Sequence, residues 1–173
     1  MMIKMIKAKI RDIPDFPQPG NVFKDITPLL GDAKAFGAAI DILKQRYGGR
    51  HIDYVVGVEA RRLVIGAALA SALGTGFIMV RNPGKLPAET LQATYELEYG
   101  TDSLEIHLDA MTPGPQVVIV DDVLATGGTM TAVTELVATL KADIIEVAFL
   151  IELLFLNGRS QLAHHSLYSL IQY

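Results

Sequence analysis

The sequence predicts an α/β fold in which a central, mostly parallel twisted sheet carries helices on both faces. Apolar runs without polar alternation, typical of strands covered on both faces, occur at 54–58, 77–80, 117–120 and 144–151. Segments with helical spacing of apolar residues alternate with these runs, which favours a parallel sheet. Half of the 173 residues are hydrophobic, so one domain can bury a substantial core.

The first expected elements precede the sheet. Residues 10–28 contain four of the eight prolines and predict an irregular arm at the start of a single domain, 1–173. Asp32 is a plausible N-cap for a helix whose apolar residues recur at helical spacing up to Tyr47. Gly48-Gly49 ends that pattern.

The remaining elements alternate along the chain, with one exception. A helix over 62–73, closed by Gly74, is expected after the first strand, and another helix, with apolar residues from Val133 to Leu140 on one face, follows the strand at 117–120. Residues 90–108 instead alternate apolar and polar side chains, which predicts a two-stranded excursion from the sheet.

Composition excludes several classes of function. The absence of cysteine excludes disulfides, thiolate nucleophiles and cysteine metal sites. No apolar run approaches the ~20 residues of a membrane span, so the cytoplasm is the expected compartment. A formal net charge of −4 argues against a nucleic-acid binder, so an anionic ligand must be met locally by cations such as Arg61-Arg62, Arg81 and Lys85.

A sugar-phosphate site is predicted where the strand at 117–120 ends. Asp121 and Asp122 follow it, and the segment 126–129, Thr-Gly-Gly-Thr, offers backbone N–H groups, hydroxyls and the positive end of a helix to a phosphate. Carboxylates would repel that phosphate, so the acids are expected to accept hydrogen bonds from vicinal sugar hydroxyls or to hold a cation. The alternative is that the acids only end a strand while Thr129 caps a helix.

Residues 117–129 resemble the phosphoribosyl-pyrophosphate motif of the type I phosphoribosyltransferase family. Segments 10–17, 22–28, 84–87 and 97–100 are similar to the adenine-specific members, and the resemblance covers nearly the whole chain. It implies purine salvage: transfer of the 5-phosphoribosyl group from 5-phosphoribosyl 1-pyrophosphate to adenine, giving AMP and pyrophosphate. It also implies magnesium dependence, a homodimer, and an N-terminal hood at 1–31 that contributes to the base pocket.

The resemblance also implies roles for individual residues. The ribose hydroxyls would be bound by Asp121 and Asp122, and the 5-phosphate by Ala125, Thr126, Gly127, Gly128 and Thr129. The pyrophosphate would face Arg61, Arg81 and Lys85, and hold magnesium itself without a direct protein ligand. The adenine pocket would be lined by Val22, Phe23 and Lys24. The ring proton would be accepted or relayed by Glu98, beside Tyr99 on a mobile catalytic loop.

Three positions depart from the family pattern. Arg62 stands where glycine is usual, and its bulk is expected to press on the pyrophosphate loop. Asn82 replaces a common lysine, and Ala88 replaces a frequent glycine. These departures put the catalytic rate and the pyrophosphate affinity in question, and the reaction type less so.

Two other functions stay open on the sequence. A phosphoribosyltransferase for xanthine, guanine or orotate would keep the phosphate site and change only the pocket around Phe23. A non-catalytic regulatory protein that senses phosphoribosyl pyrophosphate would keep the site without turnover. The acidic net charge and the lack of room for an added DNA-binding domain count against the second alternative.

Overall fold

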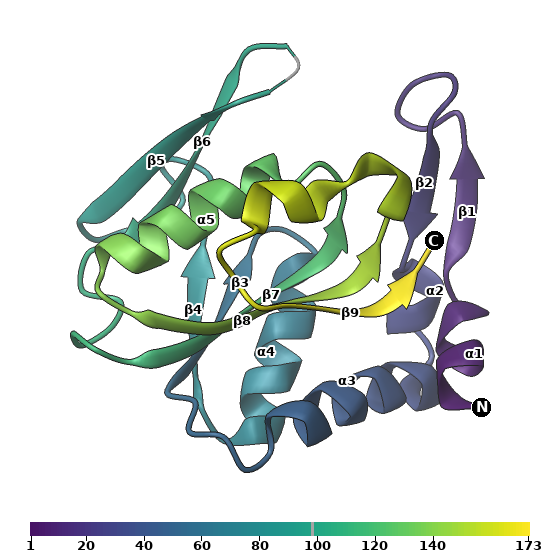
Figure 1. Cartoon of the computed structure of the whole chain (residues 1–173), viewed down its shortest axis with the longest axis horizontal. Coiled ribbons are helices and arrows are strands. Elements are labelled where there is room, and N and C mark those ends of the chain that lie inside the picture. Colours follow the sequence, from purple (N-terminus) through teal and green to yellow (C-terminus); the bar gives the residue numbers. More distant parts are fainter. Residues whose placement is uncertain (98) are drawn as a thin grey trace. The chain divides into compact units, whose positions relative to one another are not determined.

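The computed structural model describes residues 1–97 and 99–173 and divides the chain into two compact units, Met1–Arg46 and Tyr47–Tyr173. Each unit is described by itself, with elements labelled as in Figure 1. The single domain spanning 1–173, with a hood at 1–31 over the base pocket, stays a prediction. None of the described helices is long and apolar enough to cross a membrane.

The N-terminal unit contains α1 (Met2–Lys7), β1 (Arg11–Pro14), β2 (Val22–Asp25), α2 (Thr27–Leu30) and most of α3 (Ala33–Tyr47). The prediction of an irregular arm is wrong in part, because β1 and β2 pair as an antiparallel hairpin. Two charge pairs cross this hairpin: Arg11 Nη2 lies 2.6 Å from Asp25 Oδ2, and Lys24 Nζ lies 2.7 Å from Asp12 Oδ1. Such opposite-charge pairs between strands favour pairing of the strands.

The start and end of α3 confirm the prediction for this helix. Asp32 Oδ1 accepts hydrogen bonds from the backbone N–H groups of Lys34 and Ala35, at 3.1 and 3.0 Å. These bonds satisfy two of the donors that a helix start leaves without a partner. The helix ends at Tyr47, immediately before the two glycines.

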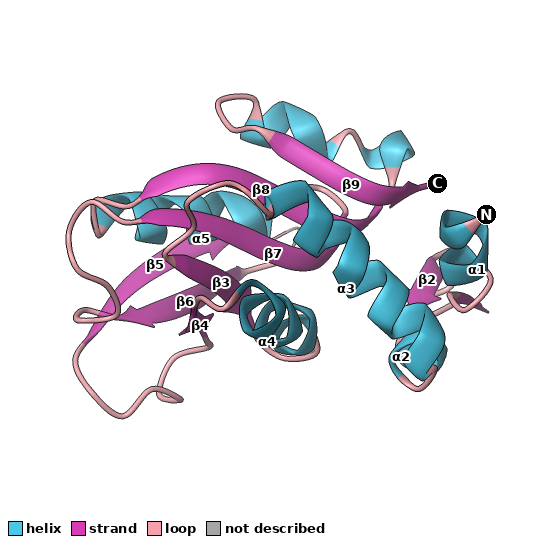
Figure 2. Ribbon diagram, turned by 90° about the horizontal axis from the view of Figure 1, so that it is seen from below, coloured by secondary structure: helices cyan, strands magenta, loops and turns pink. Residues whose placement is uncertain are grey.

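The larger unit is built on a five-stranded sheet in the order β4-β3-β7-β8-β9, in which every neighbouring pair is parallel. Its strands are β3 (Tyr54–Val58), β4 (Gly76–Val80), β7 (Gln116–Leu124), β8 (Asp143–Glu152) and β9 (Leu167–Gln172). The helices α4 (Arg62–Leu73) and α5 (Gly128–Thr139) lie on opposite faces of the sheet, as Figures 1 and 2 show. The predicted α/β class is therefore confirmed.

The core of this unit explains why the strands are continuously apolar. Successive residues of a strand point to opposite faces, so a strand covered on both sides is apolar throughout. In β7, Val117 and Ile119 belong to the core cluster that also contains Val133 and Leu136 of α5. The intervening Val118 is fully buried as well.

A hairpin of β5 (Thr90–Glu96) and β6 (Thr101–His107) confirms the predicted two-stranded excursion. The strands pair antiparallel from Thr90↔His107 to Glu96↔Thr101 and form a separate sheet. In β5, Leu91, Ala93 and Tyr95 pack against the core while the residues between them are exposed, which accounts for the alternating pattern of the sequence. Two short 3-10 helices, η1 (Leu154–Leu156) and η2 (Gly158–Leu162), connect β8 to β9.

Candidate functional site

Asp121 and Asp122, the acid pair, lie within β7. The prediction that this strand stops at residue 120 is therefore wrong. Pairing of β7 with β3 ends at Gly57↔Val120, but pairing with β8 continues to Leu124↔Glu152. The strand is longer than expected because β8 supports it on one side after β3 has ended. Asp121 and Asp122 therefore lie where β7 has lost its neighbour β3, and the segment after β3 passes there.

Two arginines from that segment pair with the acids. Arg61 Nε contacts Asp122 Oδ2, and Arg62 Nε lies 3.1 Å from Asp121 Oδ1 and 3.4 Å from Asp122 Oδ1. Asp121 and Asp122 are buried, with 3% and 1% of their surfaces exposed. Buried carboxylates require compensating charge or hydrogen bonds, and the arginines supply that charge.

Burial raises the pKa of the Asp121 carboxyl above its ordinary value of 3.8. The Arg62 guanidinium opposes this rise in the pKa of Asp121, and the neighbouring Asp122 adds to it. The net direction is upward, because the effect of burial outweighs that of Arg62.

This shift makes the stability of the unliganded protein pH-dependent. A carboxyl whose pKa is higher in the folded state contributes stability that is fully present below pH 3.8 and is lost as the pH rises through the raised pKa. Asp121→Asn removes the titrating group, so the free energy of unfolding of the variant is expected to fall less than that of the wild type between weakly acidic and neutral pH. Urea unfolding across that range measures the difference, and parallel curves for the two proteins would contradict the assignment.

The loop after β7 and the start of α5 form a cavity of about 110 Å³. Its lining includes Arg62, Asp121 and the predicted phosphate-binding residues Ala125, Thr126, Gly127, Gly128 and Thr129. Gly127 has φ +91° and occupies the N-cap of α5, a backbone conformation that favours glycine. The first backbone N–H groups of a helix have no partner within it, so this end suits an anion.

The segment that supports this loop was not predicted from the sequence. A β-carbon built on Gly127 would lie 2.7 Å from the carbonyl oxygen of Gly158, at the start of η2. A β-carbon on Gly158 would overlap the carbonyl oxygen of Ala125. The backbones of the two segments are thus in direct contact, and glycine at both positions permits it. The Asn157-Gly158 pair was the available signal, because such pairs mark turns.

The other predicted cations surround Glu59, a residue that the sequence analysis did not assign to the site. Arg81 Nη2 donates to Glu59 Oε2 at 3.0 Å, Asn82 N donates to Oε1 at 2.5 Å, and Arg81 Nη1 donates to the carbonyl oxygen of Lys85 at 3.3 Å. Burial of Glu59 opposes its ionisation, but these hydrogen bonds and the charges of Arg81 and Lys85 hold its pKa below the ordinary value. Glu59 therefore ties the end of β4 to the segment that carries Arg61.

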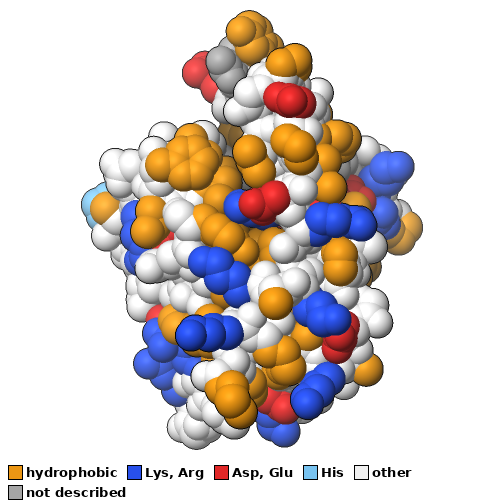
Figure 3. All heavy atoms as spheres, turned by 90° about the vertical axis from the view of Figure 1, so that its right-hand side faces the viewer, with side chains coloured by type: hydrophobic (Ala, Val, Ile, Leu, Met, Phe, Trp, Pro, Cys, Tyr) orange, Lys and Arg blue, Asp and Glu red, His pale blue; other side chains and the backbone are white. Residues whose placement is uncertain are grey.

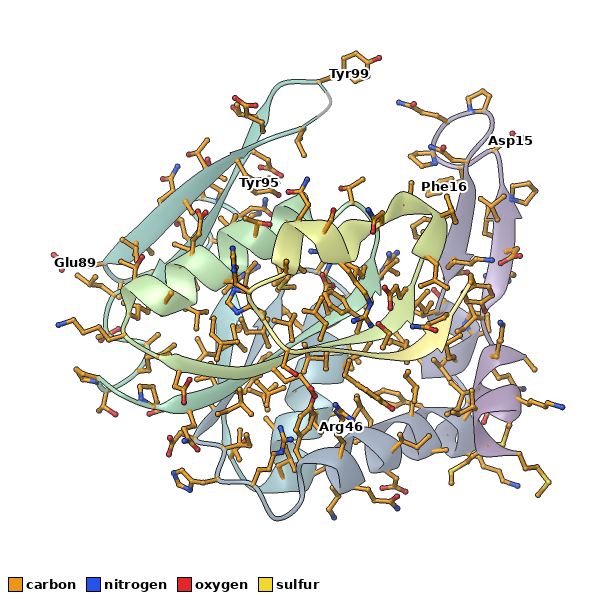
Figure 4. The ribbon with its side chains drawn as sticks, in the orientation of Figure 1. Asp15, Phe16, Arg46, Glu89, Tyr95 and Tyr99 are labelled. Carbon is orange, nitrogen blue, oxygen red and sulfur yellow. The ribbon has the colours of Figure 1, made fainter. Side chains whose placement is uncertain are left out.

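The β5–β6 hairpin is connected to Thr129, one of the predicted phosphate-binding residues, through Tyr95, which Figure 4 labels. The Tyr95 hydroxyl donates to Asp102 Oδ2 at 3.2 Å and also shares a hydrogen bond with the Thr129 side chain. Tyr99 is 82% exposed and projects from the hairpin tip (Figure 4). The predicted catalytic residue Glu98 lies outside the described residues.

The three predicted adenine-pocket residues lie on β2 of the N-terminal unit. Val22 is exposed, Phe23 packs edge-on against Phe16 with ring centroids 5.1 Å apart, and Lys24 pairs with Asp12. Because this unit is described by itself, their contact with a base stays a prediction.

The distribution of charged side chains bears on whether the protein itself could hold a metal ion. On the face in Figure 3, lysine and arginine side chains are interspersed with acidic and hydrophobic ones. Within 1–97 and 99–173, no three His, Cys, Asp or Glu side chains gather in a geometry that could hold a metal ion. The expectation that magnesium is held mainly by the substrate pyrophosphate stays a prediction.

Comparison with known proteins gives one consistent result. Residues 30–168 match the phosphoribosyl transferase domain family. The chain is 57% identical to the adenine phosphoribosyltransferase of Trichlorobacter lovleyi, over 97% of this chain and 98% of that protein. The crystal structure of adenine phosphoribosyltransferase from Thermoanaerobacter pseudethanolicus has a TM-score of 0.95 at 54% identity, with 99% of each chain covered. The Saccharomyces cerevisiae enzyme, crystallised with an imino-altritol bisphosphate and adenine, has a TM-score of 0.93 at 42% identity, with 98% of each chain covered.

Proposed function

The chain belongs to the adenine phosphoribosyltransferase family, and from this premise we propose that it transfers the 5-phosphoribosyl group of 5-phosphoribosyl 1-pyrophosphate to adenine. The products are AMP and pyrophosphate, and the reaction is a step of purine salvage. The observation that carries the proposal is the meeting of Asp121, Arg62 and the N-terminus of α5 around one cavity at the end of β7. Carboxylates suit sugar hydroxyls and the helix start suits a phosphate, so one cavity accommodates both parts of a ribose phosphate.

The ribose phosphate is held by residues of β7 and the loop after it. The 5-phosphate accepts hydrogen bonds from the backbone N–H groups and hydroxyls of residues 125–129. Asp121 and Asp122 accept hydrogen bonds from the ribose hydroxyls. Fixing both ends of the sugar orients its anomeric carbon before the bond to pyrophosphate breaks, which lowers the entropic part of the barrier.

Departure of pyrophosphate creates positive charge on the ribose and negative charge on the leaving group, as in glycoside hydrolysis. Arg61, Arg81 and Lys85 stabilise the negative charge, and each such contact is typically worth ~3 kcal/mol in the transition state. Magnesium, when bound, supplies further positive charge to the pyrophosphate oxygens. Glu59 pairs with Arg81 and keeps this guanidinium at the end of β4.

In this proposal, adenine is recognised by the predicted pocket residues Val22, Phe23 and Lys24. Phe23 stacks on the base, while Val22 and Lys24 contact it partly through backbone groups. Adenine must lose a ring proton as it attacks, and Glu98 accepts or relays that proton when the hairpin closes over the substrates. The similarity to adenine enzymes over nearly the whole chain supports this choice of base.

Asp122→Asn is expected to raise the KM for phosphoribosyl pyrophosphate about tenfold, because charged hydrogen bonds are worth about 1.5–3 kcal/mol. The KM for adenine should change little, since Asp122 contacts the sugar and not the base. Asp143→Asn is the matched control and should behave as the wild type, because Asp143 is the exposed first residue of β8, at the end of the strand away from the acid pair. An unchanged KM for phosphoribosyl pyrophosphate in a folded Asp122→Asn enzyme would remove Asp122 from the ribose site.

The choice of base is tested by assaying the purified protein with magnesium, phosphoribosyl pyrophosphate and one base at a time. Adenine should be converted to AMP, while xanthine, guanine and orotate should give no nucleotide. Turnover of one of those bases in place of adenine would support the alternative enzyme. Binding of phosphoribosyl pyrophosphate without turnover of any base would support a regulatory protein.

A homodimer working in the cytoplasm completes the proposal, as the family resemblance implies. Size-exclusion chromatography with light scattering tests the oligomeric state. A mass of twice 18.8 kDa is expected, and a mass of 18.8 kDa at assay concentrations would contradict the dimer.

A further inference from the structure

Arg62 occupies an unusual electrostatic position. It is the first residue of α4, directly after Arg61 at the N-cap, and the first turn of this helix contains no acidic residue. Cations are disfavoured at this end because the helix dipole is positive there. Arg62 must therefore obtain compensating negative charge from elsewhere in the protein or from a ligand.

The acid pair supplies part of that charge at the Nε end of the side chain. Arg62 Nε lies within 3.4 Å of a carboxylate oxygen of each acid, so its positive charge faces Asp121 and Asp122 together. A guanidinium has five N–H donors in a planar arrangement. Within the described part of the chain, the shortest contacts of Arg62 with the two carboxylates are made by Nε and not by Nη1 or Nη2.

The Arg62 side chain also lines the cavity formed by the loop after β7 and the start of α5. Arg62 contributes to its lining together with residues 125–129, and its side chain is 29% exposed. Its charge also reaches the hydroxyl of Tyr95: burial raises the pKa of Tyr95, while the hydrogen bond with Thr129 and the charge of Arg62 oppose the rise. Arg62 therefore lies close to the residues at both the sugar end and the phosphate end of the cavity.

We infer that Arg62 is a substrate-binding residue that donates from Nη1 and Nη2 to the 5-phosphate while its Nε remains on the acid pair. This inference rests on the proposed function, because it assumes that the cavity receives a ribose 5-phosphate group. It resolves an electrostatic conflict in the site. Carboxylates needed for the ribose hydroxyls would repel the nearby phosphate, and a guanidinium that contacts both offsets the repulsion.

Arg62→Gln and Arg62→Lys separate this role from simple neutralisation of the acids. Glutamine removes the charge, so we expect ribose 5-phosphate affinity to fall about tenfold to a hundredfold. Lysine restores the charge beside the acids and should keep the thermal stability near that of the wild type. Its single ammonium cannot contact the acids and the phosphate with two parallel bonds, so about tenfold weaker binding of ribose 5-phosphate should remain.

Calorimetry with ribose 5-phosphate and with pyrophosphate is the test, and Arg50→Gln, an exposed arginine before β3, is the matched control. Selective loss of ribose 5-phosphate affinity in Arg62→Lys, with pyrophosphate affinity and unfolding temperature retained, supports the inference. Equal affinities for the wild type and Arg62→Lys, or a loss confined to pyrophosphate, would overturn it. Failure of the proposed function is distinguishable, because the wild type itself would then not convert adenine to AMP.

Discussion

Gly158→Ala is expected to lower the free energy of unfolding by about 3 kcal/mol, at the upper end of the cost of overpacking. The added β-carbon would overlap the carbonyl oxygen of Ala125 and lie 2.9 Å from Leu124 Cδ1. Neither the backbone of the loop after β7, which contains Ala125, nor the buried Leu124 can move without disturbing β7 and α5. Because the loop must shift, ribose 5-phosphate affinity should fall together with stability. Urea unfolding and calorimetry measure the two effects.

Gly128→Ala is the matched control, because it adds the same methyl group to the same site. A β-carbon on Gly128 would meet no atom within 4 Å, and alanine is a better helix former than glycine. Stability should therefore be kept, while phosphate affinity falls because Gly128 lines the cavity. If Gly158→Ala unfolds at the same urea concentration as Gly128→Ala, the close contact between η2 and the loop is not a packing constraint.

Glu98→Gln is expected to reduce kcat about 100-fold or more, the usual contribution of a general base. Glutamine keeps the size of the side chain and loses the ability to accept a proton. The KM for phosphoribosyl pyrophosphate should change little, because the proposed contacts with the sugar and the phosphate come from β7 and the loop after it. Steady-state kinetics with both substrates varied separates the two parameters.

Glu96→Gln is the control for Glu98→Gln, since Glu96 is an exposed residue of the same hairpin, two positions earlier. It should retain the wild-type kcat. A Glu98→Gln enzyme with unchanged kcat would show that the proton leaves adenine by another route. Equal losses in both variants would point to the charge of the hairpin and not to a specific base.

The elements that sequence reasoning predicted correctly are those governed by local rules. The predicted strand at 54–58 and the predicted helix over 62–73 coincide with β3 and α4, and Gly74 takes the expected left-handed conformation with φ +69°. Continuous apolar runs, helical spacing and a glycine stop each depend on neighbouring residues alone. The antiparallel hairpin of β5 and β6 was predicted from the alternation of apolar and polar residues, which is also a pattern of neighbouring residues.

The features that escaped prediction depend on residues far apart in the sequence. The continuation of β7 through the acid pair is set by its pairing with β8. The contact of Gly158 with the phosphate loop joins segments more than 30 residues apart. Arg62 was expected to press on the pyrophosphate loop, whereas its side chain forms ion pairs with Asp121 and Asp122. Each of these contacts is determined by the tertiary fold and leaves no periodic signal in the sequence.

The most direct measurement of the central claim, that the cavity after β7 holds the ribose phosphate, is a crystal structure of the protein with AMP. The account predicts the 5-phosphate within hydrogen-bond distance of the backbone of residues 125–129 and of Nη1 or Nη2 of Arg62. The ribose hydroxyls should contact Asp121 and Asp122. A phosphate bound elsewhere, with this cavity containing only water while AMP is at full occupancy, would contradict the account.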